Sequence, residues 1–274
     1  MKKCSQIISG ITNTAWAILP SKMDEIMALL NSRITGEIDA EYQAARSSAS
    51  NRGGAVAILP LYGVVSQKVN LMVQYSGGTS TEMFGQWFDE AMADSSISSI
   101  VLDVDSPGGS VYGIAELSRK IYNARGKKPI IAVANSLMAS AAYWVASAAD
   151  EIHVSPGGEV GSIGVIAVHV DRSGANEKAG IKVNYVTAGD YKAEGNPDEP
   201  LQDEALGYMQ SRVNDYYSMF VSDVARNRKV STSEVLSKFG QGRVVGADMA
   251  IKQGMADKKS SFEFVLRSTA SRRS

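Results

Sequence analysis

Two residues of the chain, Ser140 and Lys192, have the types and surroundings from which a hydrolytic site could be built. Ser140 lies among small residues in segment 136–144, so a substrate backbone could reach its hydroxyl. Lys192 follows a predicted strand in segment 187–195. The chain has only two histidines and one cysteine, so a nucleophilic serine would need another base. A neutral lysine amine is the standing alternative.

Each of these segments also has an ordinary structural interpretation. A serine at this point could simply begin a helix, and a lysine after a strand is usually solvated. A lysine base must first lose its proton, which requires burial or a similar change of surroundings. The carboxylates of Asp190 and Glu194 would oppose that loss if they faced the amine.

A glycine pair supplies a third chemical feature. Gly108 and Gly109 follow an apolar strand and precede a helix, and they have no side chains to block a close approach. Their backbone N–H groups could therefore be offered to a developing oxyanion. The helix expected at 139–149 adds partial positive charge at its N-terminus, close to Ser140, which favours the same chemistry.

Other chemistries have little support in the sequence. His153 and His169 lie in apolar strands without partners at metal-ligand spacing, so no metal site is predicted. Cys4 lies next to the N-terminus, and no phosphate-binding glycine loop occurs. The net charge of −1 offers no basic field for nucleic acid or an anionic membrane. No apolar run approaches the length of a membrane span.

The elements that must position these residues follow from the apolar pattern. Short β-branched runs alternating with helical segments predict an α/β fold with a buried, mostly parallel sheet. We expect strands at 55–59, 99–104, 129–134, 151–154, 163–168 and 182–186. We expect helices at 81–93, 111–125, 139–149, 171–179 and 202–229.

Composition shifts divide the chain into three parts. Residues 1–50 contain an amphipathic helix after Ser21 and end in a polar linker, so we expect a small helical N-terminal appendage. Residues 51–258 carry the sheet and the candidate site. Residues 259–274 are basic, and we expect a solvated C-terminal tail.

The order of four motifs resembles the S49 family of serine peptidases, the signal peptide peptidase A group. These motifs are Asp-Ser-Pro-Gly-Gly at 105–109, Ala-Ser-Ala-Ala-Tyr at 139–143, Gly-Ser-Ile-Gly-Val at 161–165 and Tyr-Lys at 191–192. Segment 242–257 resembles the closing motif of that family. Segments 16–20, 70–80 and 191–197 look most like its phage members, the head-maturation peptidases.

Carried over to this chain, the resemblance implies a role for each matching residue. Ser140 would be the nucleophile and Lys192 the general base, and backbone N–H groups of Gly108 and Gly109 would form the oxyanion hole. Ser162 would hydrogen-bond the lysine amine and orient it. No metal or organic cofactor is implied. Ala141 and Ala142 stand where many members have two glycines, which narrows access to the serine.

The resemblance further implies a crotonase/Clp-protease-like fold of stacked β-β-α units and a homo-oligomer. The expected function is a serine endopeptidase of phage head maturation that cleaves scaffold, portal-associated or other head proteins. We expect it in the cytoplasm of a bacterial host cell or within a phage procapsid, with no nucleic-acid partner and no membrane span.

Three alternatives stay open at this point. The chain could be a host-type peptidase that degrades leftover signal peptides. It could be a head-assembly protein whose peptidase site is silent. The acyl-CoA chemistry found elsewhere in the crotonase fold is the most distant option, because that chemistry has no use for a Ser–Lys pair.

Overall fold

The computed structural model describes residues 14–34, 51–53, 55–68 and 78–271. Its helices are α2 (Pro20–Ile34), α4 (Thr81–Ala93), α5 (Ile114–Ala124), α6 (Ala141–Ala146), α7 (Ser173–Lys178), α8 (Asp203–Arg228), α9 (Thr232–Lys238), α10 (Ala247–Lys252) and α11 (Phe262–Ser271). The strands are β1 (Trp16–Ile18), β2 (Asn51–Gly53), β3 (Val56–Tyr62), β4 (Val65–Ser66), β5 (Thr79–Ser80), β6 (Ser99–Ser106), β7 (Gly108–Ser110), β8 (Ile130–Ala139), β9 (Glu151–Val154), β10 (Glu159–Gly161), β11 (Val244–Gly246) and β12 (Lys258–Lys259).

The central sheet confirms the predicted α/β class with mostly parallel strands. It follows the order β11-β10-β8-β6-β3-β2, and β9 pairs with β8 and β12. Neighbours β3, β6, β8, β9 and β10 pair in parallel, while β2 and β11 add antiparallel edges. A smaller sheet has the order β1-β7-β4-β5. Parallel strands need crossover connections, and α4 and α5 supply them.

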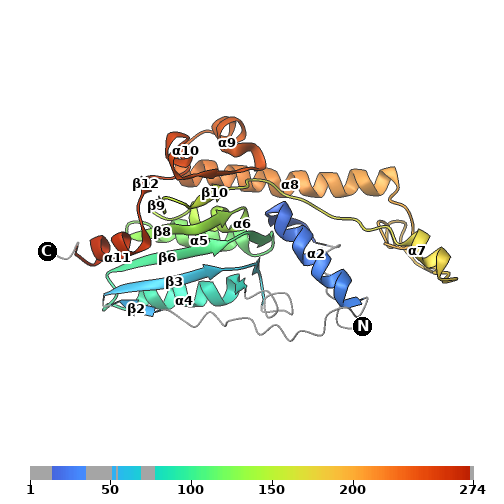
Figure 1. Ribbon diagram of the computed structural model, residues 1–274, viewed down its shortest axis with the longest axis horizontal. Coiled ribbons are helices and arrows are strands. Elements are labelled where there is room, and N and C mark those ends of the chain that lie inside the picture. The colour runs from blue at the N-terminus through green and yellow to red at the C-terminus, as the bar shows by residue number, and fades with distance from the viewer. Residues whose placement is uncertain (1–13, 35–50, 54, 69–77, 272–274) are drawn as a thin grey trace.

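The central sheet is covered on both faces, which explains its near-continuous apolar strands. On one face, α4, α5 and α6 contribute the fully buried Phe84, Ile114 and Trp144 to the large core. On the other face, α11 places Val265 against Val101 and neighbouring strand residues. Figure 1 shows the sheet at the centre of the molecule, and Phe220 of α8 joins the same large core as Phe84 of α4.

Most expected elements inside the sheet domain are confirmed. The strands expected at 55–59, 99–104, 129–134 and 151–154 appear as β3, β6, β8 and β9. The helices expected at 81–93, 111–125, 139–149, 171–179 and 202–229 appear as α4 to α8, with α6 and α7 shorter than expected.

Two expected strands are wrong. Residues 163–168 form only an isolated bridge between Ile166 and Trp16, and residues 182–186 form no strand. Both runs are β-branched, but strand formation depends on a neighbouring strand as well as on residue type. The chain leaves the central sheet after β10 and forms an arm, residues 171–202, that contains α7. Figure 1 shows α7 beyond the N-terminal end of α8, away from the sheet.

Both ends of the described chain contact the sheet domain. β1 pairs with β7, so the segment before residue 50 is tied to the part predicted as a peptidase domain. The expected solvated tail instead contains α11, whose Val265 is buried on the sheet. The predicted helix after Ser21 is α2, which begins at Pro20. The domain boundaries themselves stay predictions, and most of the polar linker and Cys4 lie outside the described residues.

Candidate active site

The candidate site forms where three parallel strands end. In the register of β6 and β8, Ser106 lies beside Met138. In the register of β8 and β10, Ala139 lies beside Gly161. Because these strands are parallel, the residues that follow them meet at one edge of the sheet. The chain continuing from β6, β8 and β10 therefore brings the segments of Gly108, Ser140 and Ser162 together.

Ser140 is held in an unusual backbone conformation. It is the residue before α6, with φ 54° and ψ −119°, and its side chain is fully buried. Its N–H donates to Gly161 O at 2.7 Å, and its hydroxyl donates to Gly164 O at 3.4 Å. A positive φ is uncommon for a residue with a side chain and marks a sharp turn that the surrounding structure must impose.

The glycine pair lies directly against Ser140. Gly108 has φ +98°, and a Cβ built on it would lie 2.9 Å from Ser140 Cβ and 3.0 Å from the Ala141 nitrogen. A Cβ on Gly109 would lie 1.8 Å from Val65 O, so no side chain fits there either. The two N–H groups differ, however. The Gly108 N–H donates to Ser106 Oγ at 3.1 Å, whereas Gly109 faces β1.

Ser162 lies beside the nucleophile candidate and shares its backbone strain. It has φ 53° and is buried, and its N–H donates to Arg243 O at 2.8 Å. It directly follows Gly161, whose carbonyl accepts the N–H of Ser140. Ser162 is thus a buried residue at the end of β10, the strand that pairs with β8 beside Ser140.

Lys192 is not brought into this group by the described chain. It lies in the arm, with its side chain exposed and its backbone N–H donating to Gly189 O. Glu194 and Gly195 line a groove together with Ala205, near the start of α8. Phe220, which stacks on Trp144 of α6, lies about 22 Å further along that helix, at 1.5 Å per residue. Position 192 is therefore remote from Ser140 in this arrangement.

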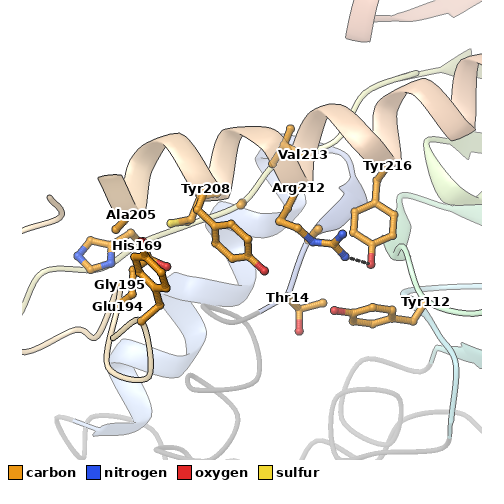
Figure 2. Close-up of a pocket in the computed structure, with 14 residues that line it drawn as sticks. Thr14, Tyr112, His169, Glu194, Gly195, Ala205, Tyr208, Arg212, Val213 and Tyr216 are labelled. Carbon is orange, nitrogen blue, oxygen red and sulfur yellow. Dashed lines mark hydrogen bonds between the residues drawn. The ribbon is translucent and has the colours of Figure 1, made fainter. Parts of the chain in front are cut away.

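Figure 2 shows the groove that joins the arm to the neighbourhood of β7. It has a volume of about 420 Å³ and runs along α8 from Tyr112 to Glu194. At one end the Tyr112 and Tyr216 rings meet edge to face at 6.1 Å, and Arg212 donates to the Tyr216 hydroxyl at 2.9 Å. The groove is thus lined by aromatic rings and a guanidinium, with Tyr112 only two residues beyond β7.

Helix α6, which carries Ser140 at its start, is anchored through its buried aromatic side chains. The Tyr143 hydroxyl donates to Met255 O at 2.9 Å, and burial raises the pKa of this phenol, which stays neutral. The Trp144 indole N–H donates to Asp223 Oδ2 at 2.8 Å, and its ring stacks on Phe220 at 4.5 Å. These contacts fix the orientation of α6 relative to α8 and to the segment that contains Met255.

Two features of the site were missed by sequence reasoning. The first is the Ala141 N–H, which lies next to Ser140 at the start of α6, where N–H groups have no partner within the helix. The helix expected at 139–149 was the signal for it. The second is β1, which lies on β7. Nothing local in residues 14–19 indicated a partner some 90 residues away in the chain.

Across residues 14–34, 51–53, 55–68 and 78–271, no cluster of three or more His, Cys, Asp or Glu side chains could hold a metal ion. In the same part of the chain, no helix combines the length and apolar character that crossing a membrane requires.

Solved structures with a related chain path include two proteases. A membrane-bound stomatin-specific protease matches 79% of this chain and 85% of its own, with a TM-score of 0.49 and 13% identity. ClpP1 from Listeria monocytogenes matches 76% of this chain and 94% of its own, with a TM-score of 0.49 and 12% identity.

Sequence relatives include phage and bacterial proteins. The capsid assembly protease C of Escherichia phage lambda is 30% identical over 249 residues, which is 91% of this chain and 56% of the relative. A head-tail preconnector protein of Enterobacteria phage P21 is 32% identical over 203 residues, 74% of this chain and 40% of the relative. Protease 4 of Salmonella typhi is 26% identical over 81% of this chain and 35% of its own length.

This chain therefore spans about half the length of the phage relatives. The family model described as peptidase family S49 matches residues 123–273, more than half of the chain and including Ser140, Ser162 and Lys192. The chain belongs to peptidase family S49.

Proposed function

We propose that this chain is a serine endopeptidase that cleaves phage head proteins, with scaffold or portal-associated proteins as its substrates. The observation that carries the proposal is the convergence of Ser140, Gly108 and Ser162 at the ends of β6, β8 and β10 in a chain of the S49 family. The names of the phage relatives support the choice of substrate. The proposed location is the cytoplasm of the bacterial host, including the inside of the procapsid.

In the proposed reaction, Ser140 Oγ attacks the carbonyl carbon of the scissile peptide bond, and its proton passes to Lys192 Nζ. The N–H groups of Gly109 and Ala141 stabilise the oxyanion, a contribution worth about 10²–10³ in kcat per donor. The tetrahedral intermediate then collapses, and the leaving amine takes the proton from Lys192. Water hydrolyses the acyl-enzyme through the same groups and releases the second peptide.

The position of Lys192 leads to a specific form of this proposal, in which the arm of a second copy supplies the base. The arm is internally ordered around Asp198, which accepts hydrogen bonds from Asn176 Nδ2 at 2.9 Å and Tyr185 OH at 2.6 Å. The Tyr185 hydrogen bond holds the pKa of Asp198 below its usual range. An ordered arm can present Lys192 to a neighbouring molecule.

Exposed apolar side chains on the arm and on the start of α8 support contact with a second copy. Val186 is 99% exposed, and further large apolar side chains in this region are exposed as well: Ile181, Val183, Tyr185, Tyr191, Leu206 and Tyr208. A patch of this kind on an otherwise ordinary surface is typical of an interaction site. A heterologous contact repeated around a ring would place each arm at the next subunit.

The proposal is tested by labelling the assembled protein with a fluorophosphonate and measuring intact mass. We expect an adduct on Ser140 in the wild type, and none in Ser140→Ala or Lys192→Ala. Incubation with candidate head proteins should show cleavage that is lost in the same two variants. An assembled wild type that forms no adduct and cleaves nothing would contradict the proposal and favour a silent assembly role.

Mixing the two inactive variants distinguishes a base supplied by the same chain from one supplied by a neighbour. In a one-to-one mixed oligomer, half of the Lys192→Ala chains have a neighbour with an intact Lys192. About half of the Lys192→Ala chains should then become labelled on Ser140. Because these chains are half of the oligomer, cleavage should reach about a quarter of the wild-type rate. No recovery in a mixture that forms mixed oligomers would exclude the neighbour's arm.

A further inference from the structure

The candidate nucleophile is completely covered in this structure. Ser140 has no exposed surface, and the same holds for Ala17 of β1. A Cβ built on Gly108 would lie 2.3 Å from Ala17 O and 2.9 Å from Ser140 Cβ, so strand β1 and Ser140 contact the same glycine. A peptide substrate that approaches Ser140 from this side would need the space that β1 occupies.

Strand β1 is paired on both of its edges with segments that flank the site. On one edge it pairs antiparallel with β7, in a register that sets Ala17 opposite Gly109. The Leu19 N–H donates to Pro107 O at 2.8 Å, and the Val111 N–H to Ala15 O at 3.3 Å. Along an antiparallel ladder, hydrogen-bonded residue pairs alternate with non-hydrogen-bonded pairs. Ala17 and Gly109 lie midway between the two bonds above, so they also form a hydrogen-bonded pair.

The other edge of β1 pairs with the segment that follows Ser162. Trp16 and Ile166 exchange two backbone hydrogen bonds of 2.8 Å each. An extended peptide held between two strands, with backbone hydrogen bonds on both sides, is a general mode of peptide recognition. In this chain the strand in that position belongs to the protein itself.

The side chains of β1 divide according to the strand alternation. Ala15 and Ala17 join the large core, which also contains Ala141 and Ala142 directly after Ser140. Trp16 and Ile18 point to the other face and pack in a separate small cluster with Met23, Ile26 and Val64. Strand β1 and α2 can therefore leave without opening most of the large core.

We infer that residues 15–19 are an internal pseudosubstrate, a strand that fills the peptide groove beside Ser140 and must leave before a substrate binds. This inference rests on the proposed function and refines its substrate class. The groove would take an extended apolar peptide with small residues facing Ser140 and large apolar residues at the alternating positions. The position of Ala17 opposite Gly109 makes alanine or a similar small residue the expected occupant there.

The first test weakens β1 at one backbone position. Ala17→Pro removes the N–H that pairs with Gly109, whereas Ser21→Pro places proline in the first turn of α2, where it is tolerated. We expect fluorophosphonate to label Ser140 at least tenfold faster in the assembled Ala17→Pro variant than in the wild type. The Ser21→Pro control should react at the wild-type rate. Equal rates in all three proteins would contradict the inference.

Hydrogen exchange separates a failure of this inference from a failure of the proposed function. In Ala17→Pro, the amide protons of Gly109, Ser110 and Val111 should exchange faster than in the wild type. A synthetic peptide with the sequence of residues 14–20 should restore their protection and slow the labelling, and a scrambled peptide should do neither. Restored protection without labelling in any variant would support the groove and contradict the nucleophile. Labelling of Ser140 that the peptide does not slow would support the nucleophile and contradict the groove.

A reversible tether tests the same strand in one folded protein. Trp16 and Ser110 face each other in a non-hydrogen-bonded pair, where the Cα atoms of antiparallel strands are closest. Trp16→Cys with Ser110→Cys, in a Cys4→Ala background, should form a disulfide that holds β1 in place. Oxidised protein should resist labelling and reduced protein should react. An oxidised, cross-linked form that reacts as fast as the reduced form would overturn the inference.

Discussion

Gly108 and Ser140 are in direct contact across the ends of β6 and β8. A methyl group on Gly108 would lie 2.9 Å from Ser140 Cβ and 2.3 Å from Ala17 O. The glycine therefore does more than permit a turn, because its missing side chain is what lets β7 approach Ser140.

Gly108→Ala should abolish fluorophosphonate labelling of Ser140, since the new methyl group displaces either Ser140 or β7. Gly126→Ala is the matched control, because Gly126 also has a positive φ of 79° but nothing within 4 Å of its built Cβ. Both variants carry the same kind of backbone strain, about 1 kcal/mol. Labelling in Gly108→Ala as fast as in Gly126→Ala would show that the contact does not matter.

Phe220→Ala should destabilise the protein by about 3–5 kcal/mol, because it removes the buried ring stacked on Trp144 and leaves a cavity. Met219→Ala, one position earlier on α8 and exposed, should change the free energy of unfolding by less than about 0.5 kcal/mol. Urea titration measures both. A loss below 1 kcal/mol for Phe220→Ala would mean that α8 is not anchored through this stack.

Asp257 should contribute stability that is lost in acid. Burial acts to raise the pKa of Asp257, but the hydrogen bonds and charge of Arg228 and the Ile152 N–H outweigh it and hold that pKa below its usual range. Its contribution is therefore present above the unfolded pKa of about 3.9 and lost as the pH falls through the lower folded pKa.

Asp257→Asn should accordingly cost about 1–3 kcal/mol at pH 7, and the difference from the wild type should shrink below pH 4. Asp215→Asn removes an exposed partner of Arg212 at 3.5 Å and should have little effect at any pH. Thermal unfolding from pH 3 to pH 7 checks both variants. A difference for Asp257→Asn that grows in acid would contradict the assignment.

Asp103 should behave in the opposite way. Burial raises its pKa, helped by the charges of Asp105 and Glu263, although the hydrogen bond from the Tyr62 hydroxyl acts to lower it. Its Oδ1 has no hydrogen-bond partner in the described part of the chain. A raised folded pKa means that stability is fully present below about pH 3.9 and declines as the pH rises through the folded value.

Wild-type protein should therefore lose stability relative to Asp103→Asn as the pH increases from 3 to 7. The change should reach about 1 kcal/mol, roughly 2–4 °C in Tm for a chain of this size. Melting curves of the two proteins across this range give the answer directly. If the stability of the wild type rose relative to that of Asp103→Asn with increasing pH, the fold would stabilise the carboxylate form of Asp103 instead.

Much of the sheet domain could be predicted from the sequence because its signals are local. The buried runs that became β3, β6 and β8 are long and apolar, and the helices α4 and α5 repeat apolar residues at helical spacing. Once parallel strands are expected, residues that follow them must meet at one edge. The resemblance to the S49 family, and not the strand pattern, implied that Gly108, Ser140 and Ser162 share a site, and the structure brings their segments together at that edge.

The sequence by itself thus determined the fold class, the family and the candidate site residues. The tertiary structure alone decided that Lys192 stands apart on an arm, that Gly108 gives its N–H to Ser106, and that β1 pairs with β7 beside Ser140. The physical reason is that these features depend on partners distant in the chain. Apolar runs such as 163–168 and 182–186 have strand character, but only packing determines whether a neighbouring strand is there to pair with them.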